Sequence, residues 1–319
     1  MISTKKIALV IPCYKVSKQL KQVLLHLPEF IDDIIVIDDA CPENSGKIAT
    51  NLAKDNIHII EHEENQGVGG AVISGYRKAI SLQSDIIVKL DGDGQMDPDQ
   101  IATLVQPILN NTADYTKGNR FHDFEALKAM PKTRLFGNSL LSFIIKAASG
   151  YWHMMDPTNG FCAISRKALQ SIHLNKIEKR YFFETDMLIH LNLANKVVQD
   201  VPIPALYNDE KSNLSIRKVI FSFPFKIAKR MIKRIYFKYY IYNFNMASIY
   251  ILIAIPLLLF GFVFGIYRWT IGILENTENS VGTVMLVVLP IILGVQFLLQ
   301  AINIDIQNIP TSKNFRTKK

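Results

Sequence analysis

Residues 85–95 read Asp85-Ile86-Ile87-Val88-Lys89-Leu90-Asp91-Gly92-Asp93-Gly94-Gln95. The apolar run within this stretch is bounded by polar residues, a pattern that predicts a buried strand. The strand ends at Asp91 and Asp93, so two carboxylates are expected at its mouth. Hard oxygen ligands suit Mg²⁺ or Mn²⁺, and magnesium is usually held by one or two carboxylates together with substrate phosphates. The stretch therefore predicts a site for a divalent metal and a nucleotide diphosphate.

Two other local structures could explain Asp91 and Asp93. An Asp-Gly-Asp-Gly string is also typical of a simple turn that binds nothing. A calcium loop of the EF-hand type would need a bidentate glutamate at its last position, where this chain has Ala102. The calcium loop is therefore excluded, and the choice between a turn and a metal site depends on the rest of the chain.

Strands and helices alternate before this stretch. Apolar runs predict strands at 7–12, 34–37 and 57–60, and helical spacing predicts helices at 17–27, 46–53 and 68–80, with Ser17 placed to cap the first helix. Strand, helix, strand, helix is the order of an α/β fold with a mostly parallel sheet. Ligands bind beyond the carboxyl ends of such strands. Pro12, Tyr14, Asp39 and the pair Asp91–Asp93 all fall there, so we expect one shared crevice.

The segment Asn65-Gln66-Gly67-Val68-Gly69-Gly70 also follows a strand and opens a helix. It could be mistaken for a dinucleotide-binding fingerprint. It lacks the full glycine spacing and follows the third strand rather than the first, which disfavours that interpretation. A helix N-terminus that lies close to a phosphate remains the expectation.

The second half of this domain carries further polar candidates. We predict helices at 98–109 and 131–148, strands at 115–119 and 197–203, a turn at 156–161 before another strand, and a helix that begins near Tyr181. Arg120 follows a strand, and Arg134 and Asn138 share one face of a helix. Guanidinium groups bind phosphate bidentately, although both arginines could also be solvated surface charges. Asp186 lies beside aromatic residues, as at the rim of a site or in a capped helix with a core Phe pair.

The C-terminal third changes in composition. The chain carries a formal net charge of +8, and 49% of its 319 residues are hydrophobic. Over 224–240 apolar residues fall on one side of a predicted helix, and Lys226, Lys229, Arg230, Lys233 and Lys238 fall on the other. Such a helix lies in the interface of an anionic leaflet, where each cation contributes about 1 kcal/mol. The alternative, a nucleic-acid-binding helix, is disfavoured by the strongly apolar sequence that comes next in the chain.

Two long apolar runs lie at 246–267 and 281–302. Each is long enough to span a bilayer, which takes about 20 residues. Basic residues before the first run and at Lys313, Arg316, Lys318 and Lys319 place both ends in the cytoplasm by the positive-inside rule. A buried helical hairpin of a soluble protein is the alternative. The exposed apolar faces of two spans could also pack against copies of themselves, so a homo-oligomer is plausible.

The cysteines and the N-terminus indicate the compartment. Cys13, Cys41 and Cys162 show neither metal-ligand nor paired spacing, so they are expected to be core thiols of a reducing compartment. Residues 1–6 lead directly into a strand, without the pattern of a signal peptide. The catalytic domain is therefore expected in the cytoplasm.

Residues 5 to about 215 resemble the family 2 glycosyltransferases of the GT-A fold. The whole chain resembles the polyprenyl-phosphate glycosyltransferases, relatives of dolichyl-phosphate mannose synthase, that carry two C-terminal transmembrane helices. The resemblance depends on the order and spacing of Ile11-Pro12-Cys13-Tyr14, Val36-Ile37-Asp38-Asp39, Asn65-Gln66-Gly67, Leu90-Asp91-Gly92-Asp93-Gly94-Gln95, Gly118-Asn119-Arg120, Thr158-Asn159-Gly160-Phe161 and Glu184-Thr185-Asp186.

The resemblance implies a domain plan. A GT-A catalytic domain, Rossmann-like with a mostly parallel sheet, would occupy 1–210. Amphipathic juxtamembrane helices would follow at 211–245. A two-helix transmembrane hairpin would span 246–268 and 280–303, and a basic cytoplasmic tail would occupy 304–319.

The resemblance also implies roles for individual residues. Pro12, Tyr14, Asp39, Asn65, Gly67 and Asp91 would bind the nucleotide-sugar donor. Asp91, Asp93 and Gln95 would hold Mg²⁺ or Mn²⁺. Arg120, Arg134 and Asn138 would bind the acceptor phosphate. Asp186, Asp93, Arg120 and Arg134 would form the catalytic set, with Asp186 acting either as a positioning residue or as a general base.

Two departures from the mannose synthase pattern leave the sugar open. Asn138 stands where those synthases have a serine, and residues 207–214 lack the arginine that precedes their Ser-Lys-Leu. The Gln-x-x-Arg-Trp signature of processive synthases is absent after Asp186, which favours transfer of a single sugar. The expected activity is inverting transfer from a UDP-sugar to undecaprenyl phosphate at the cytoplasmic face of the cell membrane, with no nucleic-acid partner. Transfer to a sugar hydroxyl and a non-catalytic membrane scaffold are the alternatives.

Overall fold

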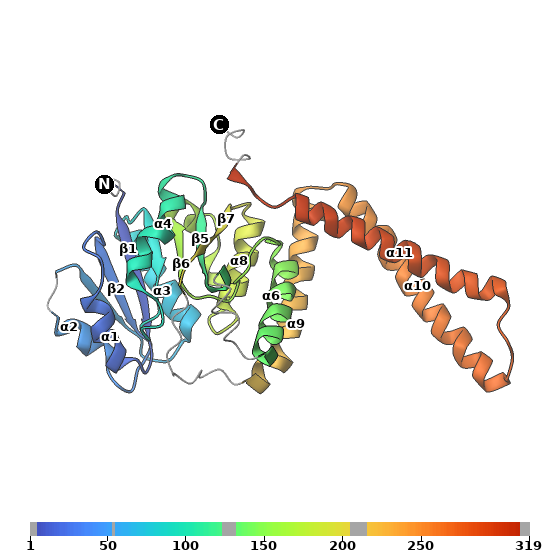
Figure 1. Cartoon of the computed structure of the whole chain (residues 1–319), viewed down its shortest axis with the longest axis horizontal. Helices are drawn as coiled ribbons and strands as arrows, with labels where there is room; N and C mark the ends of the chain where they lie inside the picture. The colour runs from blue at the N-terminus through green and yellow to red at the C-terminus, as the bar shows by residue number, and fades with distance from the viewer. Residues whose placement is uncertain (1–4, 53–54, 123–131, 205–215, 313–319) are drawn as a thin grey trace. The chain divides into compact units, whose positions relative to one another are not determined.

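The structure of the chain is a computed structural model that describes residues 5–52, 55–122, 132–204 and 216–312 (Figure 1). Within helices, the side chains of 132–136, 138 and 216–222 lie outside this description. The chain divides into two compact units, one that runs to Met231 and one that comprises Ile232–Ile309. The division falls inside a helix, so much of the predicted juxtamembrane segment belongs with the first unit. The two units are described separately.

The first unit is built on one seven-stranded sheet. Its strands are β1 (Ile7–Cys13), β2 (Asp33–Asp38), β3 (Ile57–Glu61), β4 (Ile86–Lys89), β5 (Tyr115–Asn119), β6 (Cys162–Ser165) and β7 (Val198–Pro202). Their order in the sheet is β3-β2-β1-β4-β6-β5-β7. β6 is antiparallel to β4 and to β5, and every other pairing in the described sheet is parallel. The mostly parallel sheet predicted from the sequence is confirmed.

Helices pack on both faces of the sheet and beside it. The helices up to the division inside α9 are α1 (Ser17–Leu25), α2 (Ser45–Thr50), α3 (Val68–Ser81), α4 (Ile101–Leu109), α6 (Lys132–Ser149), α7 (Arg166–Gln170), α8 (Phe183–Leu193) and α9 (Ile216–Tyr236). Alternate residues of a strand point to opposite faces. Leu9 and Ile11 therefore join a core with α1 and α4, whereas Val10 lies under α3. α3 packs closely on β1 because Gly75 has no side chain. A Cβ there would lie 2.4 Å from Val10 Cγ1.

A smaller core joins α6, α8 and α9. Ala148 of α6, Phe182 just before α8 and Ile227 of α9 are all buried in it, and Phe223 packs edge-on against Phe182. α9 begins at Ile216, within the predicted juxtamembrane segment 211–245, and contains Pro224 in its interior. The first unit therefore includes the N-terminal part of α9.

One predicted helix cap is wrong. Ser17 is the first residue of α1 rather than its cap, and Val16 occupies the cap position. The Ser17 hydroxyl donates instead to Oε2 of Glu43, at 2.6 Å. Hydrogen bonds to an ionised carboxylate are stronger than those between neutral groups, so the hydroxyl turns toward Glu43 rather than toward the helix backbone.

The second unit contains a helical hairpin. A π-helical turn, η4 (Phe237–Tyr242), leads into α10 (Met246–Glu275) and α11 (Val281–Gln307), which are 30 and 27 residues long. Both are long and apolar enough to cross a membrane. They pack closely through small residues, since a Cβ on Gly261 would lie 2.6 Å from Ile291 Cγ1. Most other apolar side chains of the pair are exposed.

A buried ion pair closes the base of this hairpin. Nη1 and Nη2 of Arg234 each lie 2.9 Å from a different oxygen of Asp305. Arg234 is 1% exposed, and Lys238 contributes a second cation at 3.4 Å. The bidentate contact joins the end of α9 to the end of α11. The predicted tail cations at 313–319 lie outside the described residues.

Candidate active site

The sheet brings three predicted site segments to one edge. β1, β2 and β4 are parallel neighbours, and their register pairs Cys13 with Asp38 and Val10 with Lys89. Tyr14, Asp39 and Asp91 therefore follow strands that end on the same side of the sheet. Pro12 is buried within β1, while the Tyr14 side chain is exposed. The three polar strand endings therefore lie at one edge of the sheet, and the shared crevice stays a prediction.

Asp39 fixes the loop before α3. Its carboxylate accepts hydrogen bonds from the backbone N–H groups of Gln66 (2.9 Å) and Gly67 (2.8 Å) and lies 2.7 Å from Nδ1 of His62. Its carbonyl oxygen accepts from Nδ2 of Asn65 at 3.1 Å. The predicted donor residues Asp39, Asn65 and Gly67 are thus brought together. The buried carboxylate of Asp39 fixes the conformation of the loop.

The same loop is tied to a distant segment. Gly67 has a φ of +84°, and a Cβ there would come 2.9 Å from the carbonyl oxygen of Lys179. The N–H of Gly70 donates to that carbonyl at 2.9 Å. Glycine is required at Gly67 both for its conformation and for this close approach. The loop therefore depends on the chain just before α8.

Asp91 is held by a buried lysine. Nζ of Lys89 lies 2.9 Å from Oδ1 of Asp91 and 3.2 Å from Oε1 of Glu184. Burial opposes the charge on Lys89, but the two carboxylates outweigh it and raise the pKa of this amine above its ordinary value. Lys89 therefore stays charged and links β4 to α8.

The turn after β4 carries the remaining predicted metal ligands. Gly94 has a φ of +74°, and the N–H of Gln95 donates to Oδ1 of Asp93 at 3.0 Å. Within the residues that the structure describes, no three His, Cys, Asp or Glu side chains gather as a metal site. Two carboxylates and an amide at one turn nevertheless fit Mg²⁺ or Mn²⁺, because these ions take further ligands from water and substrate phosphates.

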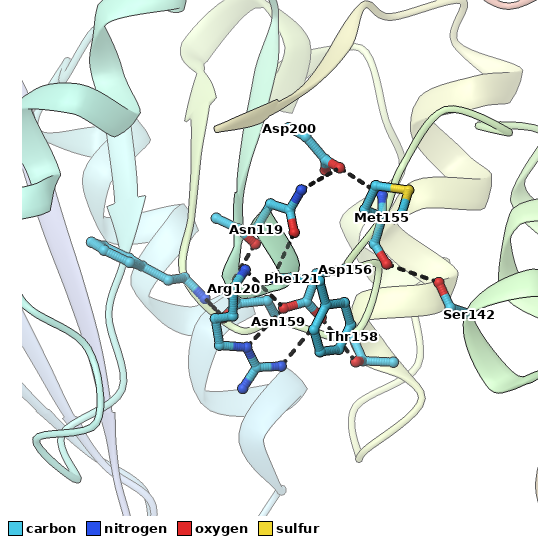
Figure 2. A network of polar contacts seen from close by, with 11 residues as sticks. Asn119, Arg120, Phe121, Ser142, Met155, Asp156, Thr158, Asn159 and Asp200 are labelled. Atoms are coloured by element: carbon cyan, nitrogen blue, oxygen red, sulfur yellow. Dashed lines mark hydrogen bonds and ion pairs between the residues drawn. The ribbon is translucent and has the colours of Figure 1, made fainter. Parts of the chain in front are cut away.

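Arg120 is anchored by a fully buried acid, as Figure 2 shows. Its Nε lies 2.7 Å from Oδ2 of Asp156, and its Nη2 lies 3.2 Å from Oδ1. Asp156 is 0% exposed, whereas the Arg120 side chain is 37% exposed. Arg120 is therefore not the freely solvated surface charge that was the alternative to a phosphate ligand. The buried acid orients its guanidinium at the end of β5.

The turn that contains Asp156 is itself fixed from two sides (Figure 2). Oδ2 of Asp200 accepts from the Met155 N–H at 2.6 Å, and the Met155 carbonyl accepts from the Ser142 hydroxyl of α6 at 2.9 Å. Nδ2 of Asn159 donates to the Gly118 carbonyl at 2.8 Å. The turn thus joins β5, β7 and α6.

Arg134 and Asn138 lie on α6, as predicted. Their side chains fall outside the part of the chain that the structure describes, so their expected contact with a phosphate stays a prediction. Further along the same helix, Leu140, Phe143 and Ile144 are exposed. This part of α6 therefore presents an apolar surface.

Asp186 is fully buried in the first turn of α8. Its Oδ2 accepts from the Glu178 N–H at 2.9 Å and from Nη2 of Arg230 at 2.8 Å, and Oδ1 lies 3.5 Å from Nδ1 of His190. Burial raises the pKa of this carboxyl, and the charges of His190 and Arg230 oppose the rise. Asp186 thus joins α8 to α9. Arg230 faces this acid, which corrects its predicted place on the membrane-facing basic side of the helix.

Comparison with known proteins identifies the family. Residues 8–172 match glycosyl transferase family 2. The chain belongs to glycosyl transferase family 2. It is a glycosyltransferase, as the sequence motifs predicted.

Two relatives with known names show how far the similarity extends. The chain is 35% identical over 223 residues to the UDP-N-acetylglucosamine–dolichyl-phosphate N-acetylglucosaminyltransferase of Methanococcus voltae, which covers 65% of this chain and 88% of that one. It is 30% identical over 203 residues to the undecaprenyl-phosphate mannosyltransferase of Micrococcus luteus, which covers 62% and 82%. Both alignments span most of the relative.

Solved structures confirm the GT-A fold of this glycosyltransferase. Glucosyl-3-phosphoglycerate synthase from Mycobacterium tuberculosis, in a complex with Mn²⁺, UDP-glucose and phosphoglyceric acid, superposes with a TM-score of 0.52. The match covers 72% of this chain and 80% of that one at 17% identity. At this identity the likeness concerns the fold.

Several residues of the site were not singled out from the sequence. They are His62, Lys89, Asp156, Asp200 and, as a partner of Asp186, Arg230. Lys89 carried the clearest signal, because a lysine inside an apolar strand must find a partner when it is buried. Asp156 was part of a predicted turn, but nothing in its neighbourhood in the sequence indicates that it pairs with Arg120.

Proposed function

We propose that this glycosyltransferase transfers a single sugar, with inversion, from a UDP-sugar to a polyprenyl phosphate, undecaprenyl phosphate in particular. The product is a lipid-linked sugar for glycan or cell-envelope modification. The names of the archaeal and bacterial relatives support a lipid phosphate as the acceptor class. The observation that carries the proposal is the burial of Asp186.

The burial of Asp186 supports a phosphate acceptor over a sugar hydroxyl. A sugar hydroxyl needs a general base within hydrogen-bond reach. Asp186 is 0% exposed, and its carboxylate is engaged by Arg230, Glu178 and His190. A phosphate monoester is already anionic at neutral pH and needs no strong base. The geometry therefore favours a phosphate acceptor, with Asp186 as a positioning residue.

The reaction is an in-line displacement. An oxygen of the lipid phosphate attacks the anomeric carbon, a new carbon–oxygen bond forms, and the bond to the nucleoside diphosphate breaks. A divalent cation held by Asp91, Asp93 and Gln95 would neutralise charge on the departing diphosphate. The Mn²⁺ and UDP-glucose in the similarly folded synthase support such a cation and donor.

The residues at the carboxyl ends of β1 and β2 form the donor side. Pro12, Tyr14 and Asp39 would border the nucleoside. The loop at Asn65 and Gly67 lies before the N-terminus of α3, whose helix dipole favours phosphate. These contacts orient the donor beside the Asp91 turn.

Arg120, Arg134 and Asn138 form the acceptor side. Asp156 holds the Nε edge of the Arg120 guanidinium, and this orients a cation suited to phosphate at the end of β5. The exposed apolar residues of α6 that follow Arg134 provide a surface suited to an isoprenoid chain. A charged headgroup site beside an apolar surface is what a lipid phosphate requires.

The hairpin of α10 and α11 supports a membrane location. Both helices are long and apolar enough to span a bilayer, and by the positive-inside rule the basic residues before α10 favour a cytoplasmic catalytic domain and cytoplasmic termini. Exposed Phe225 and Ile232, with Lys229 and Lys233 on the same helix, suit the interface of an anionic leaflet. The cell membrane is thus the proposed location.

A radiolabel transfer assay tests the proposal. Purified enzyme receives Mn²⁺ or Mg²⁺, undecaprenyl phosphate and one labelled nucleotide sugar from a panel, and label is counted in the organic phase. We expect label with one UDP-sugar, lost on adding chelator and in the Asp93→Ala variant. If nucleotide is released only when a glycan acceptor is supplied, the hydroxyl-acceptor alternative is correct. If no nucleotide is released with any donor, the scaffold alternative gains support.

A further inference from the structure

Two buried lysines lie on the same face of the sheet. Lys89 of β4 and Lys117 of β5 are both in register with Cys162 of β6, the strand between them. Residues in register across neighbouring strands point to the same face. Lys89 is 1% exposed and Lys117 is 0% exposed. The two amines are thus matched in depth and orientation.

Their surroundings differ. Nζ of Lys89 contacts the carboxylates of Asp91 and Glu184, whereas Nζ of Lys117 has no hydrogen-bond partner among the described residues. An amine buried without a partner destabilises the fold, while one buried between two carboxylates compensates their charges. Lys89 therefore forms ion pairs with two identified carboxylates, whereas Nζ of Lys117 makes no hydrogen bond among the described residues.

The partners of Lys89 come from two separate segments of the domain. Asp91 follows β4 and begins the predicted metal-binding turn, while Glu184 lies in the first turn of α8, 95 residues from Lys89. Asp91 is 27% exposed and Glu184 is 16% exposed, so water compensates neither fully. Without Lys89 the two carboxylates would lose their ion-pair partner among the described residues, and Asp91 would turn toward solvent.

We propose that Lys89 is a positioning residue that orients Asp91 for the metal–nucleotide complex. Its Nζ bridges Oδ1 of Asp91 to Oε1 of Glu184. This inference rests on the proposed function, since it assumes that Asp91 serves a metal-bound diphosphate. One oxygen of Asp91 is committed to Lys89, so the other, Oδ2, is the one presented to a cation. Gly160 lies against Oδ2, because a Cβ on that glycine would come within 2.5 Å of it. The lysine and the glycine together fix the orientation of the carboxylate.

The test compares nucleotide binding with and without metal. UDP and GDP are titrated calorimetrically into detergent-solubilised full-length enzyme, once with Mn²⁺ and once with chelator. In Lys89→Met we expect the Mn²⁺-dependent part of the affinity to fall by about 10- to 100-fold, as for other residues that orient metal ligands. The metal-free affinity should stay unchanged, because the Asp39 loop does not contact Lys89. A purely structural role would lower both.

Lys117→Met is the matched control. It removes the same kind of amine from the same face, but among the described residues no carboxylate loses a hydrogen bond, because Nζ of Lys117 makes none. Nucleotide affinity should equal that of the wild type with and without Mn²⁺, and the unfolding temperature should not fall. Glu184→Gln is a second variant of the Lys89 anchor that keeps the side-chain shape. It should lower the Mn²⁺-dependent affinity severalfold even if Lys89→Met does not fold.

The outcomes separate this inference from the proposed function. If the wild type gains UDP or GDP affinity from Mn²⁺ and both Lys89→Met and Glu184→Gln retain that gain, the positioning role is refuted while the donor class stands. If the wild type itself gains no affinity for either nucleotide from Mn²⁺, the proposed metal-assisted donor site fails, and the role of Lys89 fails with it.

Discussion

A methyl group at Gly160 would disturb the site from directly beside Asp91. A Cβ built there lies 2.5 Å from Oδ2 of Asp91, 2.6 Å from Nζ of Lys89 and 3.0 Å from Cε of Met96. Ordinary contact begins at 3.4 Å, so the Asp91 oxygen would have to retreat by about 0.9 Å. Because the Asp91 and Lys89 side chains are paired with each other, neither can move without moving the other.

The size of the effect follows from this displacement. A misplacement of about 1 Å in a catalytic arrangement can reduce the rate about 100-fold, which corresponds to about 2.7 kcal/mol of transition-state stabilisation. For Gly160→Ala we therefore expect kcat/KM for the nucleotide sugar to fall about 100-fold. The fold itself should be retained, because the clashing atoms are the ends of side chains rather than backbone.

Initial rates in the lipid-labelling assay, with donor varied at saturating Mn²⁺, measure this change. Gly282→Ala is the control, because the nearest atom to a Cβ there is Oγ of Ser280 at 3.8 Å and it lies in the helical hairpin. This control should keep wild-type rates. If Gly160→Ala stays within about threefold of the wild type, the position of Asp91 is not critical and the reasoning fails.

Three further perturbations concern the ion pairs and the metal turn. In Asp156→Asn, Arg120 loses its charged partner, so KM for undecaprenyl phosphate should rise about tenfold with no change in donor KM; equal KM values for the acceptor would contradict the anchoring role. Asp305→Ala leaves the buried charge of Arg234 uncompensated and should lower the free energy of unfolding by about 3–5 kcal/mol, measured by thermal unfolding in detergent. The double variant Arg234→Met with Asp305→Leu should restore most of the lost stability. Asp93→Asn should remove the dependence of activity on Mn²⁺ concentration together with most of the activity, and a normal Mn²⁺ titration curve would argue against Asp93 as a ligand.

The strands could be predicted closely from the sequence. Tyr115–Asn119 was predicted with its observed bounds, and the apolar runs of β1, β2 and β4 gave strands within one or two residues. β1, β2 and β4 are buried on both faces, so continuous runs rich in Ile and Val specify them without the help of neighbours. The antiparallel direction of β6 could not be predicted in the same way. It depends on how α6 and the following turn return the chain to the sheet.

The ion pairs were beyond local patterns. Arg120, Lys89 and Arg230 pair with acids that lie 36, 95 and 44 residues away in the chain. Composition shows that a charge exists, but its partner is set by the packing of distant elements. For this reason Arg230 was predicted on the membrane side of its helix, when the buried Asp186 attracts it to the other side.

The predicted site residues fall into two groups, those placed by the sheet and those placed by distant partners. Those at strand ends, such as Asp39 and Asp91, were brought together because a parallel sheet fixes where its strands end. The residues that orient them, His62 and Lys89, were not predicted. Orientation is achieved by side chains whose partners come from other parts of the fold, and a single sequence does not record those pairings.

Contacts between the donor half of the domain and the segment at α8 limit which chimeras of related enzymes can work. The donor loop depends on the Lys179 carbonyl through Gly67 and Gly70, and Asp91 depends on Glu184 through Lys89. A hybrid enzyme that takes its donor half from one homologue and its acceptor half from another, joined after α4, would separate both sets of partners. Exchange of sugar specificity by such grafting should succeed only when the segment that leads into α8 is transferred along with the donor half.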